Sequence, residues 1–373
     1  MAAMSSAALV QVCGASGAAV PPVSGRAVTS QNGSLVVSSL SGRDKTALTK
    51  PLEGGEQRSD YLPTWSPDGS QVAFVRWTPE QLSVMVVSSD GSDLRRVAAL
   101  GPRASEEENR IYDIRWSPDG AQLAYDAALP NGQSSTEAIE VAAADGSGGR
   151  RIALLPKQPF GFFSLFGWTT DSKRVTYSFS VGEPISLHYT GPSRVMTAAA
   201  DGTDTRKVVT EDSTNDGSWL GRDRLLYTRH CVGIQSVPEP CQLAIFDPAS
   251  GRSRALTHFK PLPQDSGGQW DDLPFMRRPG GDIVYSHWRK IYEFSPRTRR
   301  TRTIHTFRCP RRHCRPIEDD VYLAGISPNG RVALVEFNDD GFERPRDYRL
   351  DLKTGALTRI HLVTADAAEI FLP

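Results

Sequence analysis

The feature that most constrains the fold of this chain is an internal repeat of about 50 residues. The pentapeptide Trp-Ser-Pro-Asp-Gly occurs at 65–69 and again at 116–120, and looser copies follow along the chain. In each copy a bulky lead residue is followed eight or nine positions later by an aromatic or aliphatic residue. A fixed period of this length indicates a repeat architecture and not a single catalytic motif. The lead residues are Trp65, Trp116, Trp168, Trp219, Met276 and Ile326, separated by 51, 52, 51, 57 and 50 residues.

Each repeat reads as short strands joined by tight turns. In the first full copy QVAFVRW and LSVMVVSS are followed by Asp90–Gly91 and then by LRRVAAL. Asp-Gly between β-rich runs is a strong hairpin signal, because glycine tolerates the positive φ of a tight turn. No segment shows a sustained helical period of apolar residues. Four short strands per unit, repeated around a ring, predict an all-β protein that forms a single β-propeller.

The pentapeptide itself is explained by turn chemistry. Proline presets φ for the turn, aspartate caps it through its side chain, and glycine accepts the left-handed conformation. We therefore expect Asp68 and Asp119 to serve turns and not catalysis. The lead tryptophan, at the end of the preceding strand, is expected to pack between blades.

The number of blades follows from counting hairpins. There are six inner hairpins but seven outer ones, because an additional outer hairpin lies at 33–49. The N-terminal part thus supplies three strands, and the tail at 367–373 resembles the start of an inner strand. Joining the two ends in one blade leaves no exposed sheet edge. We expect seven four-stranded blades over 25–373, closed by the C-terminal strand in the N-terminal blade, with six blades as the alternative.

The repeat resembles the TolB-type propeller repeat, which also occurs in the propellers of prolyl oligopeptidase-like peptidases. Those peptidases join their propeller to an α/β-hydrolase domain with a Gly-x-Ser-x-Gly elbow. This chain has no such elbow, since GASGA at 14–18 lacks the spacing and DGSGG at 145–149 reads as a hairpin turn. TolB carries a separate α/β domain ahead of its propeller, which we do not expect here. The partner role of TolB therefore does not transfer.

Acidic residues just upstream of the inner strands are the first candidate site. Such segments converge on the central channel of a propeller, where carboxylates suit Ca²⁺ or a basic peptide. The alternative is that they cap loops and point outward. The predicted channel-mouth residues are Asp60, Asp113, Asp216, Asp271, Asp272, Asp319 and Asp320. No cofactor is required by this reading, with Ca²⁺ as the one candidate.

A basic segment, 295–316, contains eight arginines and is the second candidate site. Arginine makes bidentate contacts with carboxylate and phosphate, so its loop is suited to an anion or an acidic partner. The alternative is a solvated edge strand. The residues concerned are Arg308, Arg311, Arg312 and Arg315.

Four of the five cysteines fall in two close pairs, Cys231 with Cys241 and Cys309 with Cys314. Neither pair has a zinc spacing, and both read as disulfide staples of loops, which favours an oxidising compartment. Residues 1–24 carry no charged side chain and are expected to be a signal-like or disordered tail. We predict a periplasmic or secreted protein, with a cytoplasmic one as the alternative.

The expected function is that of a non-enzymatic scaffold that binds a protein or peptide. The 43 basic and 43 acidic residues balance, so no global field favours nucleic acid. No run approaches the roughly 20 apolar residues that span a bilayer. We expect a monomer. The alternative function is a hydrolase or polysaccharide lyase with a metal-assisted site at the channel mouth, as some propellers with related repeats have.

Overall fold

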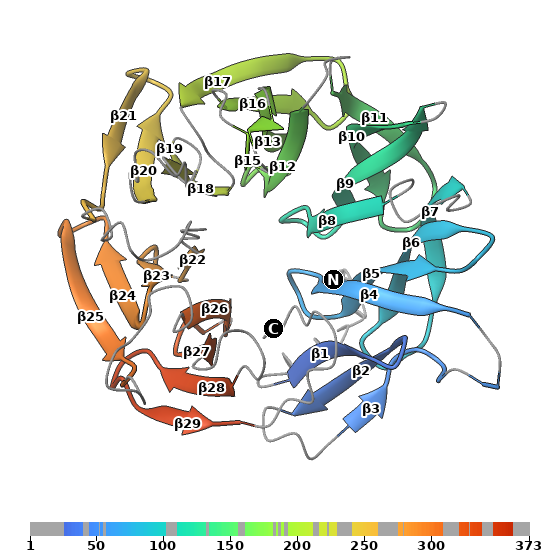
Figure 1. Ribbon diagram of the computed structural model, residues 1–373, viewed down its shortest axis with the longest axis horizontal. Helices are drawn as coiled ribbons and strands as arrows, with labels where there is room; N and C mark the ends of the chain where they lie inside the picture. Colours follow the sequence, from blue (N-terminus) through green and yellow to red (C-terminus); the bar gives the residue numbers. More distant parts are fainter. Residues whose placement is uncertain are drawn as a thin grey trace, which may run out of the picture.

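All regular elements that the structure describes are strands, and apart from one two-stranded ribbon they form seven antiparallel sheets around a central axis (Figure 1). This computed structural model describes residues 26–39, 45–51, 53–54, 57–101, 110–131, 134–155, 161–181, 184–185, 188–189, 193–211, 216–221, 224–229, 241–259, 275–278, 280–308, 321–327, 329–337 and 346–360. None of these residues belongs to a helix of the length and apolarity needed to cross a membrane. The predicted seven-bladed propeller is confirmed, and the six-bladed alternative is wrong.

The blades follow one another in chain order, and each begins with its innermost strand except the first. Blade 1 contains β1 (Arg26–Gln31), β2 (Ser34–Ser39) and β3 (Lys45–Ala47). Blade 2 contains β4 (Ser59–Trp65), β5 (Gln71–Trp77), β6 (Leu82–Ser88) and β7 (Arg95–Gly101). Blade 3 contains β8 (Arg110–Trp116), β9 (Gln122–Asn131), β10 (Ser134–Ala143) and β11 (Gly149–Leu154).

The remaining blades repeat this order. Blade 4 contains β12 (Gly161–Trp168), β13 (Arg174–Val181), β16 (Ser193–Ala199) and β17 (Thr205–Glu211), with the ribbon β14 (Pro184–Ile185) and β15 (His188–Tyr189) between β13 and β16. Blade 5 contains β18 (Gly217–Leu220), β19 (Arg224–Arg229), β20 (Gln242–Asp247) and β21 (Arg252–Ala255). Blade 6 contains β22 (Phe275–Arg277), β23 (Ile283–His287), β24 (Lys290–Ser295) and β25 (Arg300–Thr306). Blade 7 contains β26 (Val321–Ile326), β27 (Val332–Phe337), β28 (Arg346–Asp351) and β29 (Leu357–Arg359).

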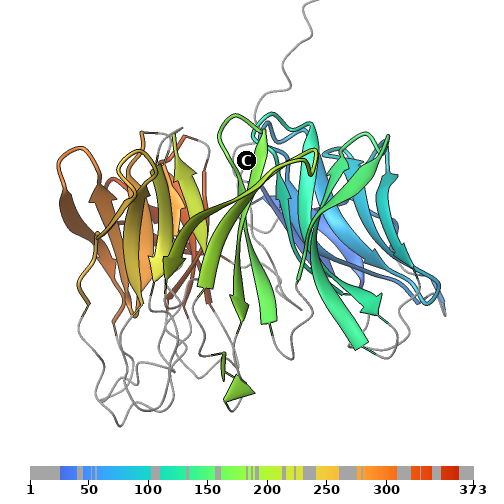
Figure 2. The same ribbon diagram turned by 90° about the horizontal axis from the view of Figure 1, so that it is seen from above.

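The antiparallel order within a blade gives the ring two different faces. Turns between the first and second strands, and between the third and fourth, open on one face, which we name the turn face. Connections between the second and third strands, and between blades, open on the other, which we name the loop face. Figure 2 shows the ring from the side, with the blades standing roughly parallel between these two faces.

The pentapeptides form turns that are closed by their own side chains. In blade 3, Asp119 Oδ1 accepts hydrogen bonds from Ser117 Oγ at 2.6 Å and from the backbone N of Ala121 at 3.0 Å. Asp68 makes the equivalent bonds in blade 2. In blade 7 an asparagine does the same work, since Asn329 Oδ1 accepts from Ser327 Oγ at 2.8 Å. The predicted turn role of these aspartates therefore agrees with the structure.

The lead tryptophans tie neighbouring blades together, as well as packing between them. Trp116 Nε1 donates to the backbone oxygen of Thr64, the residue before Trp65, at 3.1 Å. Trp168 Nε1 donates to the equivalent oxygen of Arg115 at 3.0 Å. Each bond joins the inner strand of one blade to that of the preceding blade. The lead tryptophan of the repeat therefore makes a hydrogen bond between blades in both cases.

Apolar clusters fill the space between all seven pairs of adjacent blades. The cluster between blades 2 and 3 contains Val84 and Leu123, both fully buried. Between blades 7 and 1 the cluster is the smallest in the described part of the chain, with Ala27, Leu334 and Ile360 as its buried members. Blade 1 has three strands among the described residues, so this junction has one fewer inner strand to pack. The predicted closing strand at 367–373 lies outside the described residues.

Inner strands carry β-bulges that bend them as they pass the central axis. The register shifts between Tyr61 and Thr64 in β4, and between Ile111 and Asp113 in β8. A bulge leaves one residue unpaired and changes the direction of its side chain. In β8 the register shift lies at Tyr112, which is one of the exposed large side chains of the described residues.

The turn network makes a prediction about Asp119. Asp119→Asn should change the free energy of unfolding by less than about 0.5 kcal/mol, because an amide oxygen accepts the same bonds, as Asn329 shows. Asp119→Ala should cost about 1 kcal/mol, because the turn loses its acceptor. Chemical denaturation of both variants measures the difference. Equal losses for asparagine and alanine would contradict the hydrogen-bonding role.

A second prediction concerns closure of the ring. Trp65 Nε1 is buried, and no described residue accepts its hydrogen. By the pattern of Trp116 and Trp168 its acceptor belongs to the innermost strand of blade 1. Deleting 367–373 should therefore lower the melting temperature. The free energy of unfolding should fall by several kcal/mol, on the order of the loss of one buried strand. Deleting 1–24 is the control and should leave it unchanged. A tail deletion that melts like the full chain would rule out the predicted closure.

Candidate functional site

Asp60, the first of the predicted channel-mouth acids, is held in an ion pair inside blade 2. It lies opposite Arg76 in the register of β4 and β5, and its side chain is fully buried. Arg76 Nε and Nη2 donate to its two carboxylate oxygens at 2.7 and 2.8 Å. This bidentate pair neutralises the charge that burial would otherwise make costly.

Asp113, the second predicted acid, lies in a group of three carboxylates in blade 3. Its partner in the register of β8 and β9 is Asp126, which is 2% exposed. Glu137 on β10 lies on the same side of the sheet and accepts a bond from the backbone N of Phe163 on β12 at 2.5 Å. Arg115 Nε donates to Asp113 Oδ2 at 2.8 Å and provides one positive charge at its edge. We name Asp113, Asp126 and Glu137 the blade-3 carboxylate group.

The blade-3 carboxylate group favours its protonated form. Burial raises the pKa of Asp126 well above its usual range, and the charges of Glu137 and Asp113 raise it further. Burial also raises the pKa of Glu137 to about 7, although the bond from Phe163 lowers it. Asp126 Oδ1 is buried and accepts no hydrogen bond from the described residues. Burial therefore favours the protonated form of the Asp126 carboxyl in the folded protein.

Sequence reasoning found Asp113 and missed its two neighbours. Asp126 stands within the apolar strand LAYDAAL, and an ionisable residue in such a run was the available signal. A similar pair occurs in blade 7, where Glu336 lies opposite Asp347 and burial raises the pKa of Asp347 to about 7. Both groups are made by register, which places acids from different strands side by side.

The other predicted acids are not gathered with these. Asp216 precedes β18 in blade 5, and its Oδ1 accepts from the backbone N of Gly217 at 2.7 Å. Asp60 and Asp113 lie on the adjacent blades 2 and 3, while Asp216 lies two blades further round the ring. Asp271, Asp272, Asp319 and Asp320 lie outside the described residues, so a shared acidic mouth stays a prediction. Within the described ranges no three His, Cys, Asp or Glu side chains are placed to hold a metal ion.

Of the predicted basic residues, Arg308 is exposed after β25, and Arg311, Arg312 and Arg315 lie outside the described residues. Cys241 is fully buried at the start of β20 and is disulfide-bonded. Its predicted partner Cys231 lies outside the described residues, as do Cys309 and Cys314. Both pairings therefore stay predictions.

The inner strands of blades 3 and 7 each carry an exposed tyrosine, and blades 1 and 2 lie between them in the ring. Tyr112 on β8 is 43% exposed and Tyr322 on β26 is 54% exposed. Both stand four residues before the lead residue of their repeat, and Tyr61 on β4 holds the same position, partly buried. The guanidinium of Arg110 lies 5.9 Å from the centre of the Tyr112 ring. We name Tyr61, Tyr112 and Tyr322 the inner-strand tyrosines.

No protein-family model matches this chain, and no curated protein matches its sequence. The fold is similar to a puromycin-hydrolyzing peptidase of Mycobacterium tuberculosis, with a TM-score of 0.60 and 14% identity over 89% of this chain and 50% of that one. This chain thus spans half the length of that peptidase. An oligogalacturonate lyase in complex with manganese has a TM-score of 0.59 and 13% identity over 91% of this chain and 86% of that one.

TolB from Acinetobacter baumannii also matches, with a TM-score of 0.45 and 13% identity over 74% of this chain and 62% of that one. At these identities the likenesses show the propeller fold alone. The TolB-type assignment of the repeat therefore stays a prediction.

The blade-3 carboxylate group makes a prediction about pH. The pKa of Asp126 lies well above its ordinary 3.8 in the folded state and that of Glu137 rises from 4.5 to about 7, so the folded protein holds protons that the unfolded chain releases. The free energy of unfolding therefore falls as the pH rises from about 4 to about 7. In the Asp126→Asn variant the free energy of unfolding should fall less with pH. At high pH it should be greater than that of the wild type by about 1 to 3 kcal/mol.

Urea denaturation at a series of pH values measures this effect. Asp93→Asn removes an exposed carboxylate and controls for the change in net charge. Parallel profiles for the wild type and Asp126→Asn would show that the buried carboxyl ionises without cost.

Proposed function

We propose that this chain is a non-enzymatic extracytoplasmic propeller that binds a protein or peptide partner at the inner-strand tyrosines. The exposure of Tyr112 and Tyr322 at one repeat position is the observation that carries the proposal. Large exposed aromatic side chains are enriched at protein interfaces, where they bury much area at little conformational cost. Tyr112 lies at the register shift of β8, and bulges of this kind change the direction of a side chain.

Charge and shape around Tyr112 support a peptide-sized partner. Arg110 and Arg115 flank it on β8, and both are exposed. Arginine and tyrosine together are the side chains that most often dominate binding energy at an interface. Two more tyrosines hold the same repeat position, Tyr61 on β4 of the neighbouring blade 2 and Tyr322 on β26 of blade 7.

The proposed extracytoplasmic location rests on the cysteines. Two close pairs in loops are typical of proteins from oxidising compartments. The uncharged segment 1–24 is consistent with a signal, and the disulfide at Cys241 accords with this location.

The alternative is a metal-assisted hydrolase or polysaccharide lyase, because an oligogalacturonate lyase shares the fold over most of both chains. Its predicted ligands Asp271, Asp272, Asp319 and Asp320 lie outside the described residues. Elemental analysis of the purified protein separates the two functions. A stoichiometric metal that is lost in a variant with these four acids changed to asparagine would favour the enzyme.

Peptide display on the immobilised full chain tests the binding function. We expect selected peptides to bind the wild type and to lose about tenfold or more in affinity with Tyr112→Ser/Tyr322→Ser, since interface tyrosines often contribute over 1 kcal/mol each. Leu94→Ser/Leu154→Ser is the matched control, because these are the other exposed large apolar side chains in the described residues, at 44% and 49% exposure. It should bind as the wild type does.

Two results would contradict the proposal. One is that no peptide is enriched over an unrelated immobilised protein. The other is that the enriched peptides bind the tyrosine variant as tightly as the wild type.

A further inference from the structure

A cavity of about 750 Å³ opens between blades 5 and 6, away from the inner-strand tyrosines. It is bordered by the turn from β18 to β19, the turn from β22 to β23, and the end of β24, all of which belong to the turn face. A volume of this size suits a small-molecule ligand. We name it the blade 5–6 pocket.

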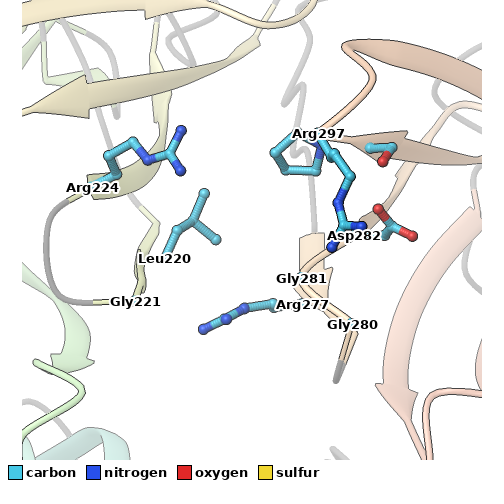
Figure 3. Close-up of a pocket in the computed structure, with 10 residues that line it drawn as sticks. Leu220, Gly221, Arg224, Arg277, Gly280, Gly281, Asp282 and Arg297 are labelled. Atoms are coloured by element: carbon cyan, nitrogen blue, oxygen red, sulfur yellow. The ribbon is translucent and has the colours of Figure 1, made fainter.

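Positive charge predominates in the blade 5–6 pocket. Its charged lining residues are Arg224, Arg277, Arg297 and Asp282. Figure 3 shows Arg224 projecting into the space from the side of blade 5, with Arg277 and Arg297 on the side of blade 6. No hydrogen bond or ion pair joins any of the three guanidinium groups to another described residue. Among the described lining residues three arginines stand against one aspartate, and outside the lining the hydrogen bond from Ser250 and the charge of Arg224 lower the pKa of Asp247 on the neighbouring strand β20.

The backbone keeps this pocket open. Gly221 and Gly281 border it with φ of +66° and +90°, conformations that favour glycine over other residues. A Cβ added at either position would meet no heavy atom within 4 Å. No described residue therefore occupies the space beside these two glycines.

The turn of blade 6 that borders the pocket differs in sequence from the corresponding turns of the other repeats. In blades 2, 3, 4 and 7 the residue after the lead residue is a serine or threonine whose hydroxyl closes the turn, such as Ser66 and Ser117. In blade 6 that position is Arg277, which faces the pocket instead. The capping aspartate of the pentapeptide is absent there as well, because the sequence reads MRRPGGD. The change removes an acid from the turn and adds a base, which turn formation does not require.

We propose that the blade 5–6 pocket binds a small organic or inorganic anion with at least two acidic groups, carboxylate or phosphate. Arginine pairs with either group through two parallel hydrogen bonds, so guanidinium groups from two blades suit a ligand with two acidic ends. Such a ligand bridges blades 5 and 6. Asp282 opposes it by like charge and sets an upper limit on its affinity.

Isothermal titration calorimetry on the full chain in phosphate-free, low-salt buffer tests this site with two probes, citrate and pyrophosphate. We expect one of them to bind at one site per chain, with an affinity that falls as sodium chloride screens the charges. Arg224→Gln/Arg277→Gln/Arg297→Gln should lower that affinity by at least tenfold, since hydrogen bonds to charged groups are among the stronger ones. Which probe binds more tightly distinguishes a carboxylate ligand from a phosphate ligand.

Matched control variants distinguish binding in the pocket from a general effect of the protein's net charge. Arg254→Gln/Arg349→Gln/Arg359→Gln removes the same charge from exposed strand positions outside the pocket and should bind as the wild type does. Asp282→Asn should bind more tightly, because the opposing charge is gone. The proposal is overturned by binding of neither probe, by equal affinity of the pocket variant and the wild type, or by an equal loss in both triple variants. Circular dichroism melting of each variant shows that it is folded.

Discussion

The packing of each blade against the next is the interaction on which the rest of this molecule depends. A four-stranded sheet has two faces to cover and cannot cover them alone. Here every pair of adjacent blades shares an apolar cluster, and the lead tryptophans add hydrogen bonds between inner strands. The seven clusters make this packing continuous around the ring.

This arrangement explains why the turns divide into two kinds. Where a turn only has to connect strands, serine and aspartate satisfy its backbone, as Ser117 and Asp119 do. Because the apolar clusters pack the blades together, turn residues can differ between blades while the propeller fold is kept. Blades 5 and 6 show this freedom, since their turns carry Arg224 and Arg277.

The buried acids differ from one another in whether a basic side chain accompanies them. Arg76 faces Asp60 across two strands and donates to both of its carboxylate oxygens. Asp126 has no such partner among the described residues, and burial raises its pKa. The stability of the ring therefore depends on pH through blade 3 and, by the pair Glu336 and Asp347, through blade 7.

The sequence alone determined the fold class, the seven blades, the turns and the three N-terminal strands, because these depend on local patterns that recur at a fixed period. It also singled out Asp113, which was expected just upstream of an inner strand and lies within β8. Only the tertiary structure decided that Asp60 pairs with Arg76, that Asp113 lies beside Asp126 and Glu137, and that Arg224 and Arg277 share a pocket. The physical reason is that strand register and blade packing bring these residues together across gaps of 11 to 53 positions, for which side-chain chemistry has no local signal.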